Sequence, residues 1–278
     1  MNKITQTLDA LLIVFGLLAA SCGVLRGASF SKADPTLVQT QGTGGQIFEK
    51  ATLMGFQKEV EGALSEQRSH TTDYFKTAEH DFEKRRYADA ADNYQKSSGV
   101  IPTMSAYLNL GLSLWYVSNF AQAQEAFSSG LRIAIKKQDR KFEAAFRGNI
   151  GNVYLNQGKL EEALKSYRDA LAIHEEIGNP LEQANVLNNI GLIYYQRGKL
   201  EEALKSHRDA LTTFNEIGNP LGQANARTNI GIVYRKQGKY EEALRPLNEA
   251  RVIFSRIGVT GKLQFVERMI SQLESATK

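Results

Sequence analysis

The sequence is poor in the residue types on which disulfide-stapled domains, metal proteins and many enzymes depend. It contains a single cysteine, Cys22, so no disulfide can form within the chain. Its four histidines do not fall in a His/Cys/Asp cluster with metal-ligand spacing. Ser113, in the stretch GLSLW, lacks the second glycine of a nucleophile elbow and falls in an expected helix. These absences predict a protein that is not an enzyme and has no cofactor or metal.

Strong charge of one sign and a membrane-length hydrophobic run are also missing. The formal net charge of +4 is spread over segments of mixed sign, which argues against nucleic-acid binding. The apolar run from Ala10 to Ala20 is too short to cross about 30 Å of hydrocarbon comfortably. With 42% hydrophobic residues the chain can still bury a substantial core. We therefore expect a globular protein that binds neither nucleic acid nor a small-molecule substrate.

The most prominent feature present is an internal repeat of forty residues. Residues 149–184 and 189–224 are identical at 25 of 36 aligned positions, a third copy begins at Asn229, and a weaker one begins at Asn109. A fixed period of this length is typical of stacked helices, in which each unit buries its apolar face against its neighbours. His174 and His207 align with Phe214 and Tyr167 of sister copies, which predicts that both histidines are core residues.

Turn residues divide each copy into two helices. Gly158, Gly198 and Gly238 stand where the first helix must turn back, a place that favours a left-handed backbone. The second helix is expected from Lys159 to Ile177, and Gly-Asn-Pro then ends it and starts the next helix. In the two weaker units Arg85 and Ser118 replace the turn glycine, which predicts looser helix breaks there. Pro246 is expected to kink the last second helix.

Together these positions resemble the tetratricopeptide repeat (TPR). The residues that match its pattern of small and large side chains are Gly151, Tyr154, Leu160, Ala163, Tyr167, Ala170 and Pro180. The forty-residue spacing is similar to the subclass found in kinesin light chains and in adaptors that orient cell division. A shorter early unit contains Ala78, Phe82, Tyr87, Ala90 and Tyr94.

The resemblance implies an all-α fold, a right-handed α-solenoid. We expect a leading helix within 47–70 and an array over 71–258, whose five units cover about 71–103, 104–143, 144–183, 184–223 and 224–258. Residues 259–278 are expected to form a capping helix over the last apolar face.

The N-terminal segment has the layout of a signal peptide. Lys3 precedes the apolar run, and small residues stand directly before Cys22. The stretch LAASC resembles the bacterial lipobox, which implies cleavage after residue 21, a lipid on Cys22 and a flexible tether over 22–46. An uncleaved short anchor and an ordinary secretory signal are the alternatives.

One face of the first helices carries a row of amides. In the third unit Ala145, Asn149, Asn152 and Asn156 follow the spacing i, i+4, i+7, i+11, and one of these positions is Asn in four units. TPR geometry implies that this face lines a concave groove that binds an extended peptide. The predicted groove residues are Asn109, Asn149, Asn152, Asn156, Asn185, Asn189, Gln196, Asn225, Asn229 and Lys236.

The choice of asparagine supports this prediction independently of the resemblance. A merely solvated helix face favours Lys, Glu and Arg, which have better helix propensity. An amide both donates and accepts, so it can pair with the backbone of a guest peptide of any sequence. Alternatively, the amides bond to the neighbouring repeat and only hold the array together.

Two functional classes are consistent with the sequence. The first is a non-enzymatic protein–protein interaction scaffold, lipid-anchored in the bacterial envelope; Gly23, by the Gram-negative sorting rule, suggests the outer membrane facing the periplasm. The second is a TPR regulator, tethered to the inner membrane by an uncleaved anchor or facing the cytoplasm, that senses a peptide or partner domain. Both require a protein partner whose identity the sequence does not contain.

Overall fold

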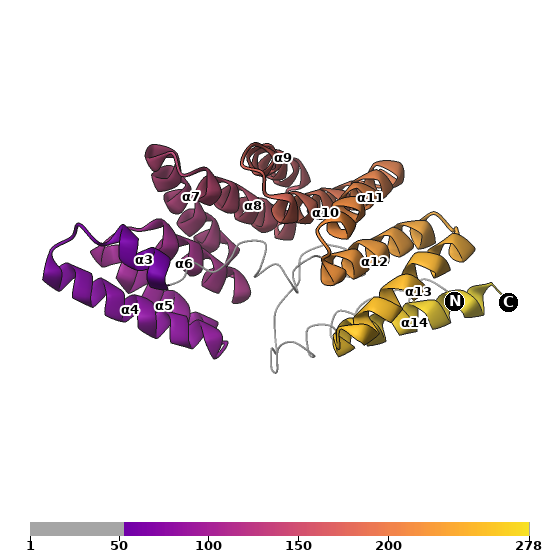
Figure 1. The fold of residues 1–278 in the computed structure, drawn as a ribbon, viewed down its shortest axis with the longest axis horizontal. Coiled ribbons are helices and arrows are strands. Elements are labelled where there is room, and N and C mark those ends of the chain that lie inside the picture. Colours follow the sequence, from indigo (N-terminus) through magenta and orange to yellow (C-terminus); the bar gives the residue numbers. More distant parts are fainter. Residues whose placement is uncertain (1–52, 278) are drawn as a thin grey trace. The chain divides into compact units, whose positions relative to one another are not determined.

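The computed structural model describes residues 53–277, and within that range the chain forms twelve α-helices, labelled α3 to α14, and no β-strand (Figure 1). Successive helices pack as antiparallel pairs, which confirms the expected all-α, TPR-like architecture. The described chain divides between two compact units, here called the N-terminal unit (residues 53–178) and the C-terminal unit (residues 179–277).

The N-terminal unit contains seven of the described helices. Their bounds are α3 Leu53–Glu59, α4 Ser65–Glu83, α5 Tyr87–Val100, α6 Met104–Tyr116, α7 Phe120–Lys137, α8 Arg140–Asn156 and α9 Leu160–Glu176. The first helix of the first unit, α4, thus begins at Ser65 rather than near 71. The short α3 packs on it, because the rings of Phe56 and Phe75 stack with their centroids 4.0 Å apart.

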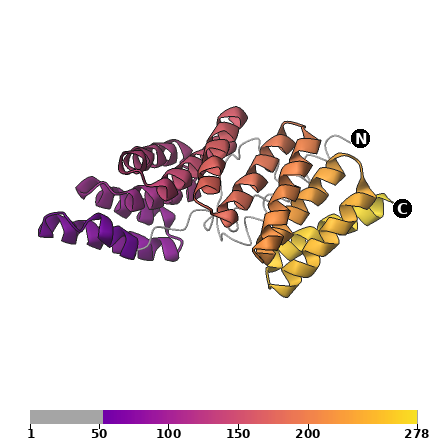
Figure 2. The same ribbon diagram turned by 45° about the horizontal axis from the view of Figure 1, so that its top comes forward.

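The C-terminal unit contains five helices of 17 residues each. They are α10 Pro180–Gln196, α11 Leu200–Glu216, α12 Pro220–Lys236, α13 Tyr240–Arg256 and α14 Thr260–Ala276. In Figures 1 and 2, α12 and α13 lie side by side and α14 lies next to α13. One side of α14 buries Phe265, Val266, Met269, Ile270 and Leu273, whereas the intervening residues are mostly exposed. It covers apolar surface on one side and presents polar residues on the other.

Left-handed residues end the helices as the turn glycines predicted. Gly158, Gly198 and Gly238 have φ of 73°, 71° and 76°. The expectation of looser breaks at the two positions without glycine is wrong. Arg85 and Ser118 adopt φ of 58° and 62°, so they make the same left-handed turn at a conformational cost that glycine avoids.

Pro246 lies inside α13, as the sequence predicted, but the helix continues through it. Helix α13 spans 17 residues, the same length as α9 and α11, which have no internal proline. The proline removes one backbone donor, and α13 packs on α12 and α14.

In four helix pairs, α6–α7, α8–α9, α10–α11 and α12–α13, a glycine of the first helix lies directly under a large side chain of the second. A Cβ atom added to Gly151 would lie 2.9 Å from the Tyr167 ring, and one added to Gly191 would lie 2.5 Å from the His207 ring. At such distances the ring must shift before a methyl group can fit. The small and large residues of the repeat pattern therefore set how closely the paired helices approach.

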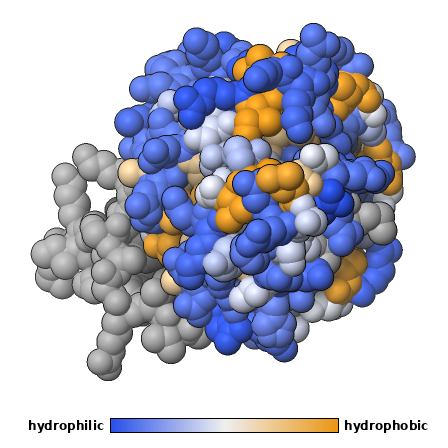
Figure 3. All heavy atoms as spheres, turned by 90° about the vertical axis from the view of Figure 1, so that its left-hand side faces the viewer, coloured by the Kyte–Doolittle hydropathy of each residue, from blue (hydrophilic) through white to orange (hydrophobic). Residues whose placement is uncertain are grey.

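The surface is largely polar. Figure 3 shows one face on which hydrophilic residues dominate and hydrophobic residues form small separate patches. Among residues 53–277, no helix combines the length and hydrophobicity required to cross a bilayer.

Candidate functional site

The predicted amide face lies on the first helices of the pairs, and most of its residues are deeply buried. Asn109, Asn149, Asn185, Asn189, Asn225 and Asn229 are 0 to 4% exposed. Asn152, Asn156 and Gln196 are partly buried, and Lys236 is exposed. Cys22 and the predicted signal peptide and tether lie outside the described residues.

In the N-terminal unit the amides bond mainly to their own repeat or to the helix before. Asn109 Nδ2 donates to the hydroxyl of Tyr94 on α5 at 3.3 Å. Asn149 Nδ2 donates to the carbonyl of Ala145 one turn earlier at 3.1 Å. Asn152 Oδ1 accepts a short hydrogen bond from the Tyr167 hydroxyl, which joins α8 to α9. In this unit the amides therefore help to hold neighbouring helices together, and binding of a guest by them stays a prediction.

In the C-terminal unit one amide belongs to a buried network that crosses three helices. Asn188 Oδ1, on α10, lies 2.7 Å from His207 Nδ1 on α11 and accepts from Asn229 Nδ2 on α12 at 3.2 Å. Because Asn188 presents a carbonyl oxygen to both, His207 carries its proton on Nδ1. The sequence prediction that His207 and His174 are core residues is confirmed, since they are 0% and 2% exposed.

Burial controls the protonation of both histidines. Desolvation lowers the pKa of His207 to about 3 and that of His174 to about 4. Both imidazoles are therefore neutral at physiological pH. No group of three or more His, Cys, Asp or Glu within the described part of the chain could hold a metal ion.

Asn225, another predicted groove residue, contacts a lysine that the sequence analysis did not single out. Lys262 Nζ, on α14, donates to Asn225 Oδ1 at 2.8 Å. Burial lowers the pKa of the Lys262 ammonium to about 8. The corresponding Asn185 has a different neighbour, because its Nδ2 lies 3.5 Å from Glu182 Oε2.

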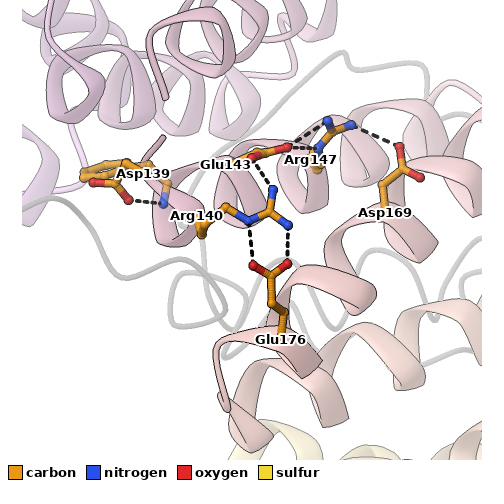
Figure 4. A network of polar contacts seen from close by, with 7 residues as sticks. Asp139, Arg140, Glu143, Arg147, Asp169 and Glu176 are labelled. Carbon is orange, nitrogen blue, oxygen red and sulfur yellow. Dashed lines mark hydrogen bonds and ion pairs between the residues drawn. The ribbon is translucent and has the colours of Figure 1, made fainter. Parts of the chain in front are cut away.

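A network of ion pairs joins α8 to α9 in the N-terminal unit (Figure 4). Glu143 is 7% exposed and accepts from Arg140 at 2.6 Å and from Arg147 at 2.9 Å. The two arginines also reach across to the second helix, where Arg140 pairs with Glu176 and Arg147 Nη1 lies 3.0 Å from Asp169 Oδ2. Two arginines pair with three carboxylates, and each of these five side chains is occupied by a partner within the network. The network holds α8 and α9 together.

A shallow hollow of about 460 Å³ lies at the turns of the C-terminal unit, and none of its lining residues is a predicted groove residue. Residues 179–181 and 217–220, from two successive Gly-Asn-Pro segments, form its walls. None of these residues is ionisable. The hollow has no group that could perform acid–base or nucleophilic chemistry.

Some site residues could not have been identified from the repeat alone. The signal for Lys262 was its place in the first turn of a helix, where a cation opposes the helix dipole. The signal for Asn188 was that a polar residue interrupts the apolar face of α10. Neither feature predicts which side chain of another helix the residue contacts.

Comparison with known proteins agrees with this architecture. A model of the tetratricopeptide repeat family matches residues 102–176, 141–216 and 182–255, which together make up more than half of the chain. The chain therefore belongs to the tetratricopeptide repeat family. Members of this family generally mediate protein–protein interactions and are generally not enzymes. No curated protein matches the sequence.

Solved structures share the fold at low sequence identity. The apo form of RapI is 16% identical with a TM-score of 0.64, and the match covers 74% of this chain and 84% of that one. A signal transduction ATPase with a tetratricopeptide repeat sensor, from Pyrococcus horikoshii, is 18% identical with a TM-score of 0.67, covering 81% and 35%. A single-residue variant of the nearly identical TPR-like repeats of a Podosopora anserina kinesin light chain is 12% identical with a TM-score of 0.59, covering 70% and 99%. Identities this low show a common fold alone.

Proposed function

We propose that this protein is a non-enzymatic adaptor that binds an extended peptide or partner segment along the amide face of its first helices. The observation that carries the proposal is the constant register of the amides in the C-terminal unit. Asn185 and Asn189 on α10 recur as Asn225 and Asn229 on α12, each pair one helical turn apart. A repeated row of donors and acceptors matches the repeated N–H and C=O groups of an extended chain.

These amides carry an energetic cost. Asparagine is a poor helix former, and a buried amide is stabilising only when its donors and acceptors are paired. Asn229 pairs with Asn188, and this contact holds two helices together. Asn225 Nδ2 has no partner among the described residues, although the residue is fully buried. A guest carbonyl or carboxylate would satisfy that donor, so the proposal assigns binding to Asn185, Asn189 and Asn225 and bracing to Asn229.

The test compares amides on the first helices of the pairs with an amide on a second helix. The full-length protein, carrying a photo-crosslinking residue at Gln196, is used to capture partners in cells of its source organism. The variant Asn189→Ala with Asn225→Ala should weaken binding of the captured partner at least about five-fold, because polar groups left unpaired cost about 1–3 kcal/mol.

A matched control lies on a second helix. Asn248 Nδ2 donates only to the Leu244 carbonyl of its own helix α13 at 2.9 Å, so Asn248→Ala should leave partner binding unchanged. Unaltered capture by the double variant, accompanied by a large drop in the free energy of unfolding, would show that the amides serve only the fold.

We further propose that the adaptor is anchored in the bacterial envelope by a lipid on Cys22. The support is the signal-peptide layout before this cysteine, which lies outside the described residues. Palmitate labelling of the full-length protein should be lost in Cys22→Ala. A wild-type protein that is neither labelled nor cleaved favours instead the TPR regulator held by an uncleaved anchor.

A further inference from the structure

Lys262 occupies an unfavourable position for a cation. It lies in the first turn of α14, where the positive end of the helix dipole repels an ammonium and attracts an anion. That turn contains no acidic residue, and no side chain caps the helix. By contrast, α9, α11 and α13 each begin with two glutamates. A negative charge at this position would therefore stabilise α14, whereas the charge of an ordinary lysine does not.

The surroundings of Lys262 favour its neutral amine. The Nζ atom donates to the uncharged Asn225 amide at 2.8 Å and lies 5.9 Å from the centroid of the buried Phe254 ring. No carboxylate of the described residues forms an ion pair with it. Burial lowers the pKa of the ammonium to about 8, and no charged side chain contributes to this shift. At pH 8 about half of Lys262 is therefore a nucleophilic amine, against less than about 1% of an ordinary lysine.

The adjacent amide has a donor without an acceptor. Asn225 is fully buried, its Oδ1 accepts from Lys262, and its Nδ2 has no partner in the described part of the chain. Because Nδ2 and Oδ1 belong to one planar carboxamide, the unused N–H lies beside the lysine nitrogen. A buried donor left unpaired destabilises the fold. An oxygen attached through one atom to Nζ would satisfy it.

We propose that Lys262 is a modification site at which carbon dioxide forms a carbamate that Asn225 binds. The neutral amine attacks the carbon of carbon dioxide, so that a C–N bond forms and the electron pair of one C=O bond moves onto its oxygen. One N–H proton leaves to water, and no oxidant or leaving group is required. Carbon dioxide is small and uncharged, and Lys262 is only partly buried, so the amine is within its reach.

The carbamate matches the two polar atoms of Asn225. Its remaining N–H keeps the hydrogen bond to Oδ1, and the oxygen on the same side of the carbamate accepts from Nδ2, as in a pair of amides. The second bond is strengthened by the negative charge of the acceptor. The modification also replaces a cation by an anion in the first turn of α14, the position that favours an anion. Carbon dioxide thus reverses the charge at the start of this helix.

This inference does not depend on the proposed function, although the two share one donor. A guest group and the carbamate both accept from Asn225 Nδ2, so they compete for it. Carbamate formation should therefore weaken the binding of a captured partner, and carbon dioxide becomes a regulator of the adaptor.

The test exposes the full-length protein to bicarbonate labelled with carbon-13, which equilibrates with carbon dioxide, and follows the carbamate carbon by NMR. A carbamate resonance should appear and saturate as carbon dioxide is raised. Triethyloxonium then traps the carbamate as its ethyl ester, and mass spectrometry identifies the modified lysine. A series of pH values separates the pKa of the amine from the equilibrium constant between the neutral amine and carbon dioxide.

Two lysine variants assign the signal. Lys262→Met keeps the aliphatic stem over Phe254 and should lose both the resonance and the trapped product. Lys239→Met removes an exposed lysine of the same unit and should leave both unchanged. Any resonance of the α-amino group, whose usual pKa is also about 8, should persist in both variants and serves as an internal reference.

Two asparagine variants test the binding of the carbamate. Asn225→Leu removes the Nδ2 donor and should lower the equilibrium constant at least about ten-fold, as expected for a hydrogen bond to a charged group. Asn225→Asp has nearly the same shape and places a negative charge beside Nζ, so it should preserve the fold and suppress the carbamate.

Several outcomes would overturn the proposal. They are no trapped product at Lys262 in the wild type, trapping of many lysines to an equal extent, and an undiminished equilibrium constant in a folded Asn225→Leu or Asn225→Asp. The measurement uses no cellular partner, so its failure is distinct from failure of the adaptor function. If Lys262 is modified but no protein partner is captured, the site stands and the adaptor function is refuted. If a partner is captured but Lys262 is not modified, the adaptor function stands alone.

Discussion

The two near-identical copies, residues 149–184 and 189–224, pack their paired helices in the same way but form different hydrogen bonds. Each has a glycine on its first helix under a large ring of its second helix. In the earlier copy the ring is Tyr167, whose hydroxyl donates to Asn152 on the same helix pair. In the later copy the ring is His207, which pairs with Asn188 and through it with Asn229 on the next pair. A scaffold can therefore be duplicated while its polar contacts change from local to inter-repeat.

The two copies also have their histidine at different positions of the repeat. The earlier copy has Tyr167 and His174, and the later one has His207 and Phe214 at the same two positions. Each copy thus contains one buried, neutral imidazole, and the two imidazoles lie at different positions along the second helix. Substituting one copy's residue into the other tests whether these choices are interchangeable.

The largest expected effect is acid destabilisation. Because the folded pKa values, about 3 and about 4, lie below the unfolded value of 6.5, the unfolded chain takes up protons first. Stability is then fully present above pH 6.5 and is lost as pH falls toward 4 and 3. From pH 7 to pH 5 each histidine should cost about 2 kcal/mol, measured by urea unfolding at both pH values.

Exchange of residues between the copies isolates this effect. His174→Phe and His207→Tyr each take the residue of the sister copy and should each remove about half of the histidine contribution. If both variants retain the full pH dependence, carboxylates rather than the histidines govern the acid response.

The second prediction concerns His207→Tyr at neutral pH, which should destabilise the fold by about 1–3 kcal/mol. The new hydroxyl meets Leu192, where the earlier copy has Asn152, and Asn188 keeps Asn229 but loses its hydrogen bond with His207. Adding Leu192→Asn rebuilds the local pair of the earlier copy and should recover about 1 kcal/mol in urea unfolding. An unchanged stability of the single variant would mean that the inter-repeat network has no net value.

Third, the two glycines should tolerate a methyl group differently. Gly191→Ala should cost about 1–2 kcal/mol, because overpacking against His207 exceeds the gain in helix propensity. Gly151→Ala, whose Cβ would lie 2.9 Å from the Tyr167 ring rather than 2.5 Å from His207, should stay within about 1 kcal/mol of the wild type. Paired thermal unfolding curves decide between them, and a reversed order would contradict the packing geometry.

The smallest effect is expected from the ion pairs of α8. Arg147 lies two residues before the earlier copy and corresponds to Leu187, which lies two residues before the later copy and cannot form an ion pair. Arg147→Leu should cost about 0.5–1 kcal/mol at low salt and less at high salt, because partly exposed ion pairs are screened. A loss that does not depend on salt concentration would indicate that the aliphatic stem of Arg147, rather than its charge, stabilises the pair.

Local signals in the sequence predicted local structure well. The turn glycines and the Gly-Asn-Pro segments predicted the helix boundaries of the three strongest repeats. The prediction failed at Arg85 and Ser118, because contacts with the rest of the fold hold a left-handed turn that those residues do not favour alone. The kink predicted at Pro246 stays a prediction, although α13 has the same 17 residues as α9 and α11.

Among the site residues, the sequence identified the register of the amides and their helices, but not their partners. Asn109, Asn149 and Asn229 are equivalent in the repeat, and yet they donate to a tyrosine hydroxyl, a backbone carbonyl and another asparagine. Each contact depends on how a neighbouring helix is rotated and spaced. That geometry follows from packing over the whole face, not from residues nearby in sequence.

By itself the sequence determined the repeat, the class of fold and the positions of the turns, because helix periodicity and turn chemistry act over a few residues. Only the tertiary structure decided that His207 meets Asn188 and that Lys262 meets Asn225 without a carboxylate. Those side chains lie on different helices, and long-range packing brings their polar atoms within 3 Å of one another.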